Sequence, residues 1–69
     1  MNKYLLTLFA LRRMLFHFSE NDVIDALTWL QNNSVSFVAV QLILQSEQIK
    51  PDQKLYAYLN ILYPRVFHE

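Results

Sequence analysis

Residues 34–49, SVSFVAVQLILQSEQI, are almost entirely apolar or uncharged, and Glu47 is the only charged residue among them. Wound as a helix, the segment gathers Gln41, Gln45 and Gln48 into one narrow polar stripe, while the rest of the helix is largely apolar. This pattern predicts a central helix with a thin exposed edge. The β-branched run 35–40 also suits a strand, but no second convincing strand exists for it to pair with. We therefore favour the helix.

The residues around this segment predict three more helices, which gives helices over about residues 2–18, 20–32, 35–48 and 51–63. Ser19 is suited to cap the second helix, with Phe18 at a hydrophobic-staple position beside it. Asparagine tolerates the left-handed conformation, so Asn32 and Asn33 are suited to end that helix. Ser34 or Ser36 can cap the third helix.

Pro51 fits the first turn of the fourth helix, where a backbone N–H is not needed, and Pro64 indicates that this helix ends near Tyr63. The connections are short, and short connections place consecutive helices side by side in antiparallel pairs. We predict an all-α fold, a small bundle of two consecutive helical hairpins, in a single domain over residues 1–69.

The first helix has a broad apolar arc on one side of its helical wheel. Five of its residues share the main stripe and three widen it: Tyr4, Leu8, Leu11, Leu15 and Phe18, with Leu5, Phe9 and Phe16. The opposite side is predicted to be the polar face, made of Asn2, Lys3, Thr7, Arg13 and His17. Such a wide arc exceeds what one helix contact needs, so we expect two neighbours, or one neighbour and a partner.

The length and composition of the chain limit how it can be stabilised and in which compartment we expect it. It has 69 residues, a formal net charge of zero, and neither cysteine nor glycine. A domain of this size buries only about 60% of the surface that its unfolded chain exposes, so it needs good helix packing or association with another chain. The lack of cysteine excludes disulfides and fits a reducing compartment, so we expect a cytoplasmic protein.

The sequence offers no pattern of residues for catalysis or for metal binding. His17 and His68 are the only histidines, and further ligands at suitable spacing are not evident. We expect no enzymatic activity, catalytic residue, metal, cofactor or small-molecule substrate. The apolar run 4–11 is far shorter than the roughly 20 residues of a membrane span, so we expect no membrane partner.

A small helix-turn-helix regulator that binds DNA is the alternative hypothesis. The second and third helices follow each other closely, and Gln41, Gln45 and Gln48 could contact adenine bases. Phosphate contacts require Lys or Arg, however, and the third helix has neither before Lys50. Arg12 and Arg13 form one small basic spot. We therefore do not favour nucleic acid as the partner.

The favoured hypothesis is a non-enzymatic protein–protein interaction module. Its form is a homodimer, or a small adaptor, chaperone or inhibitor that covers a hydrophobic surface of another protein. Several helices have more apolar surface than a monomeric bundle needs, and large aromatic side chains bind partners at low entropic cost. The predicted partner-binding residues are Phe9, Trp29, Tyr56 and Tyr63.

Overall fold

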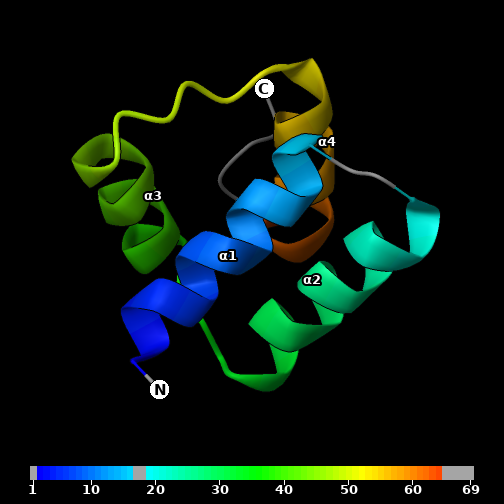
Figure 1. Cartoon of the computed structure of the whole chain (residues 1–69), viewed down its shortest axis with the longest axis horizontal. Coiled ribbons are helices and arrows are strands. Elements are labelled where there is room, and N and C mark those ends of the chain that lie inside the picture. The colour runs from blue at the N-terminus through cyan, green and yellow to red at the C-terminus, as the bar shows by residue number, and fades with distance from the viewer. Residues whose placement is uncertain (1, 17–18, 65–69) are drawn as a thin grey trace.

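The computed structural model describes residues 2–16 and 19–64, and these residues form four helices and no strand. In chain order the helices are α1 (Lys3–Phe16), α2 (Glu20–Asn32), α3 (Phe37–Ser46) and α4 (Gln53–Leu62) (Figure 1). The all-α prediction is confirmed, and the strand alternative for residues 35–40 is wrong. The predictions that concern His17, Phe18 and His68 lie outside the described residues.

A side chain caps the N-terminus of each of α2, α3 and α4. In each case an oxygen accepts a hydrogen bond from a backbone N–H three residues later, which the helix itself leaves without an acceptor. The pairs are Ser19 with Asp22 (3.2 Å), Ser36 with Ala39 (3.1 Å), and Asp52 with Leu55 (2.8 Å). Because Asp52 is the cap, Pro51 precedes α4 and does not lie in its first turn, as the sequence had suggested.

The C-terminal ends of α2 and α3 share one geometry. Ser34 (φ 52°) and Gln48 (φ 56°) adopt the left-handed conformation that usually falls to glycine. The next residue then donates its N–H to a carbonyl in the last turn, Val35 to Leu30 at 3.1 Å and Ile49 to Leu44 at 2.8 Å. Asn33, which was predicted to be left-handed, instead has φ −98°, because the left-handed residue is the next one, Ser34.

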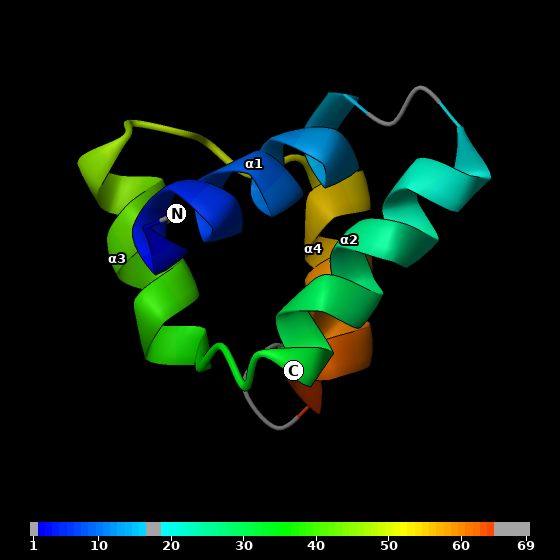
Figure 2. The same cartoon turned by 60° about the horizontal axis from the view of Figure 1, so that its bottom comes forward.

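The helix α1, rather than α3, occupies the centre of the fold. It contacts α2, α3 and α4, whereas α3 has its main contact with α1 (Figure 2). Val38 and Leu42 of α3 are 62% and 60% exposed. The prediction of a central helix over residues 34–49 is therefore wrong. The 10-residue α3 presents one side to the 14-residue α1, and residues 2–16 and 19–64 contain no further helix that covers its other side.

The buried side of α1 is also rotated from the predicted one. Leu8 and Leu11 are buried as expected, but so are Thr7, which was predicted on the polar face, and Ala10 and Met14, which lie outside the predicted apolar arc. Leu5, Phe9 and Phe16, predicted to widen the apolar face, are exposed. Small side chains such as Ala10, and Ala26 on α2, let two helices approach closely, which large aromatic side chains prevent.

Thr7 shows how a polar residue fits this interior. Its side chain is 2% exposed, and its hydroxyl donates a 2.8 Å hydrogen bond to the Lys3 carbonyl one turn earlier. That bond satisfies the hydroxyl, so burial does not leave an unpaired polar group.

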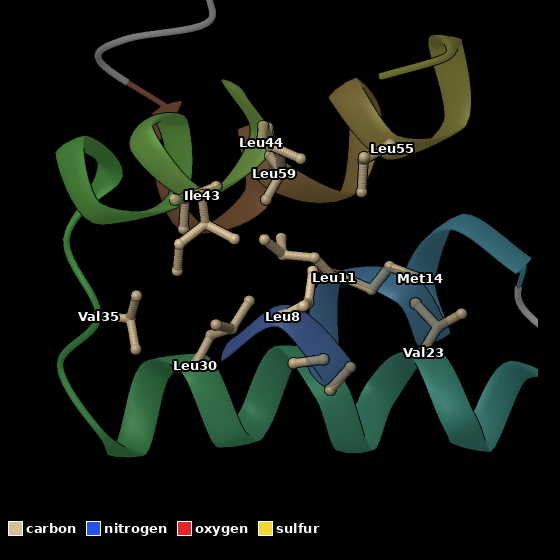
Figure 3. Close-up of a cluster of buried hydrophobic side chains, with 13 residues drawn as sticks. Leu8, Leu11, Met14, Val23, Leu30, Val35, Ile43, Leu44, Leu55 and Leu59 are labelled. Atoms are coloured by element: carbon tan, nitrogen blue, oxygen red, sulfur yellow. The ribbon is translucent and has the colours of Figure 1, made fainter. Parts of the chain in front are cut away.

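Side chains from all four helices form one core. Figure 3 shows Leu8, Leu11 and Met14 of α1 directed toward residues of the other three helices and of the loop before α3. These are Val23, Leu30, Val35, Ile43, Leu44, Leu55 and Leu59. The inner side of α1 is thus fully used by the core, and its outer side remains available to solvent.

Candidate interaction surface

Large apolar side chains remain exposed on every helix. In the part of the chain that the structure describes, those most exposed are Leu5, Phe9, Phe16, Ile24, Val38, Leu42, Tyr56 and Ile61. Single exposed apolar residues are ordinary on protein surfaces, so exposure alone does not locate a site. A site needs such residues to share a concave surface with polar groups at its edge.

One such surface is the groove between α1 and α2, here called the α1/α2 groove. Its lining residues are Leu6, Phe9, Ala10, Arg13, Asp25, Ala26 and Trp29, and its volume is about 300 Å³. The helix α2 runs back along α1 in the opposite direction (Figure 1). In an antiparallel pair, the step from Phe9 to Arg13 on α1 matches the step from Trp29 to Asp25 on α2. On each wall the aromatic residue, Phe9 or Trp29, therefore lies toward one end of the groove, and the charged residue, Arg13 or Asp25, lies toward the other end.

The groove combines an apolar floor with one charge of each sign. Ala10 and Ala26 are buried, Trp29 is half-buried and packs on the core, and Phe9 is 48% exposed. Arg13 and Asp25 are exposed on opposite walls. Two of the four predicted partner-binding residues thus lie together, at positions 20 residues apart in the sequence.

The charges of the two helices that form the groove are of opposite sign. The helix α1 carries Lys3, Arg12 and Arg13 and no acidic residue. The helix α2 carries Glu20, Asp22 and Asp25 and no Lys or Arg. Sequence reasoning noted the total charge of zero and the basic spot of Arg12 and Arg13 but missed this separation, although the blocks of like sign are visible in the chain.

Tyr63 has a structural role that its sequence position did not indicate. Its hydroxyl donates a 2.7 Å hydrogen bond to the carbonyl of Val35, in the loop between α2 and α3. Its ring packs at an angle of 57° to Phe37, with 5.9 Å between the ring centres. Burial raises the pKa of the Tyr63 hydroxyl above its ordinary value of 10.0. These contacts join the end of α4 to the start of α3.

Tyr56 lies away from the α1/α2 groove. It is exposed and lines a smaller groove of about 200 Å³ beside α3, together with Phe37, Leu44, Ile49 and other residues. The four predicted partner-binding residues are therefore divided between two places. Phe9 and Trp29 share the α1/α2 groove, whereas Tyr56 and Tyr63 both lie near Phe37.

A polar cluster joins the start of α1 to the end of α3. The Tyr4 hydroxyl lies 2.7 Å from Glu47 Oε2 and 3.0 Å from Ser46 Oγ, and Arg12 Nη2 lies 3.9 Å from Glu47 Oε1. Below it, a groove of about 430 Å³ runs between α1 and α3 with Lys3 and Leu42 among its lining residues. Because these contacts hold the end of α3 against α1, we assign the cluster to the packing of α3.

Neither a metal centre nor a membrane span is found among residues 2–16 and 19–64. No three His, Cys, Asp or Glu side chains in these ranges are placed to hold a metal ion. The helices there also lack the combination of length and hydropathy needed to cross a bilayer. The chain matches no family model, and comparisons with curated proteins and with solved structures found no match.

Proposed function

We propose that the protein is a non-enzymatic protein–protein interaction module and that the α1/α2 groove is its binding surface. The observation that supports this most directly is Phe9, a large aromatic side chain that is half-exposed in a groove also lined by Trp29 and by the opposite charges of Arg13 and Asp25. Aromatic side chains in a concave setting with a polar rim are typical of the residues that dominate protein interfaces.

The energy available at Phe9 is sufficient to matter for binding. A phenylalanine buries roughly 200 Å² when fully covered, so a side chain that is 48% exposed leaves about half of that area in water. At about 25 cal/mol per Å², covering the remainder contributes about 2 kcal/mol, or roughly a 30-fold change in dissociation constant.

The alternative of DNA binding through α3 gains no support from the arrangement of that helix. Its exposed side carries Val38, Gln41, Leu42 and Gln45, and the helix contains neither Lys nor Arg. Contacts with phosphates need such cations. We propose that the protein is located in the cytoplasm, because a chain without cysteine suits a reducing compartment.

Affinity capture from an extract of the source cells, followed by mass measurement of the intact complex, tests the proposal. The bait is compared as wild type, as Phe9→Glu in the groove, and as Val38→Glu on α3, a matched change of an exposed apolar residue. We expect a specific protein with wild type and Val38→Glu, and at least tenfold lower recovery with Phe9→Glu. The proposal would be wrong if Phe9→Glu and Val38→Glu recovered equal amounts of the bound protein, or if wild type bound no protein at all.

A further inference from the structure

We infer that the occupant of the α1/α2 groove is a second copy of this chain, in a two-fold symmetric dimer that lays α1 of each copy over α2 of the other. The inference rests on the proposed function, because it names the partner of the same groove. Its argument comes from how charge is distributed around the groove.

A closed two-fold interface must be complementary to itself, since each residue on one side meets a symmetry-related residue on the other. The α1/α2 groove satisfies this condition. Arg13 and Asp25 line opposite walls toward one end of the groove, and Phe9 and Trp29 line the same two walls toward the other end, one helical turn away along each helix. One wall is therefore the electrostatic complement of the other.

Charge then selects between the two possible symmetry axes. An axis parallel to the groove places Arg13 of each copy opposite Asp25 of the other, and Phe9 of each copy against Trp29 of the other. An axis across the groove would instead stack α1 on α1 and α2 on α2. That arrangement would bring the Arg13 side chains of the two copies to one side of the interface and the Asp25 side chains to the other, so that cations lie near cations and anions near anions, which is unfavourable at close range.

The size and total charge of the chain also suit a dimer. A standard interface buries about 800 Å² per partner, which is about one sixth of the 4929 Å² surface of this chain. With a formal net charge of zero, two copies approach without overall repulsion. The outer side of α1, with its exposed Leu5, Phe9 and Phe16, supplies apolar area for such a contact.

The test measures the mass of the purified chain by sedimentation equilibrium from about 1 μM to about 500 μM, a range that brackets weak to moderate dissociation constants. We expect a mass approaching twice 8.3 kDa as concentration rises. Arg13→Asp and Asp25→Arg should each weaken dimerisation about tenfold, because each makes two symmetric pairs repulsive. Circular dichroism of each variant at low concentration checks that the helices remain.

The decisive sample is an equimolar mixture of the two single variants. In it, Asp at position 13 of one chain meets Arg at position 25 of the other, and Arg13 of the second chain meets Asp25 of the first. A heterodimer should therefore form near wild-type affinity, an effect in trans that altered folding of either variant cannot produce. The double variant Arg13→Asp/Asp25→Arg should likewise dimerise as wild type does.

Three results would overturn this dimer arrangement. The first is a mass of 8.3 kDa at every concentration. The second is a dimer that neither single variant weakens, since stacking of α1 on α1 has like charges opposed from the start. Both results leave the proposed function standing if the Phe9→Glu bait still loses a captured protein. A loss of dimer in the mixture as severe as in each single variant would also contradict the inference.

Discussion

The hydrogen bond from Tyr63 to Val35 leads to a sharp prediction about stability. The change Tyr63→Phe removes the hydroxyl that lies 2.7 Å from the Val35 carbonyl but keeps the ring that packs on Phe37. A hydrogen bond of this kind contributes about 1 kcal/mol net. In a domain of 60–100 residues, that loss lowers the melting temperature by roughly 4–8 °C. Urea titration and thermal melting, both followed by circular dichroism, measure the two quantities.

The matched control is Tyr58→Phe, because the Tyr58 hydroxyl makes no hydrogen bond with any residue of the described ranges while its ring also packs against the core. We expect that control to change stability by less than about 0.5 kcal/mol. The reasoning is refuted if Tyr63→Phe behaves like the control in both melts. If it also reduced recovery of a bound protein, Tyr63 would act at a partner surface, as its sequence position had suggested.

Three further predictions concern the same fold. Burial raises the pKa of the Tyr63 hydroxyl in the folded chain, so the protonated hydroxyl stabilises the fold fully below the unfolded pKa of about 10, and this stabilisation is lost as the pH rises through the folded pKa. Between about pH 9 and 11, urea titrations should therefore show a smaller loss of stability for Tyr63→Phe than for wild type. Leu11→Ala should cost about 2–5 kcal/mol in urea, because Leu11 is 1% exposed on the central helix, whereas Leu42→Ala should cost less than about 1 kcal/mol. Gln48→Gly should raise the melting temperature by a few degrees, since glycine adopts φ 56° without steric cost, and Gln41→Gly within α3 should lower it by about as much.

The sequence predicted the helices well because the signals that delimit a helix are local. Ser19 and Ser36 each cap a helix by bonding to an N–H only three residues away, so their effect does not depend on the rest of the fold. The left-handed residues were harder to place. In a chain without glycine, Ser34 and Gln48 adopt that conformation, and neither residue type is favoured there strongly enough to be found from sequence.

The sequence did not determine which side of each helix is buried. Helical periodicity weights each residue by its hydrophobicity, and so it assigned Phe9 to the core side and Thr7 to the surface. Packing also depends on how closely two helix axes can approach. Ala10 and Ala26 permit that approach, and the rotation they impose brings Thr7 inside and leaves Phe9 outside.

The same limit applies to the candidate site. The aromatic residues Phe9, Trp29, Tyr56 and Tyr63 were selected because each flanks or lies beyond an apolar stripe, and this criterion cannot separate a residue at a surface groove from one that stabilises a loop. Tyr63 is both, because its hydroxyl is bonded to Val35 and its side chain also lines a groove of about 240 Å³ between the ends of α2 and α4. Only the antiparallel register of α1 and α2 places Phe9 beside Trp29, and register depends on contacts between residues distant in the sequence.

The relation between composition and association follows from the same geometry. A chain with no glycine and twelve leucines has more apolar surface than four short helices can enclose, since the helices in this fold bury one side each. The excess appears on all four helices, and Phe9, Phe16, Ile24, Val38, Leu42 and Ile61 are among the exposed side chains. Of these places, only the α1/α2 groove combines an exposed aromatic side chain with walls of opposite charge. Burial of apolar area contributes affinity but does not select one orientation of the partner. The charges of Arg13 and Asp25 favour one orientation, so we expect association of this chain to be specific at the groove.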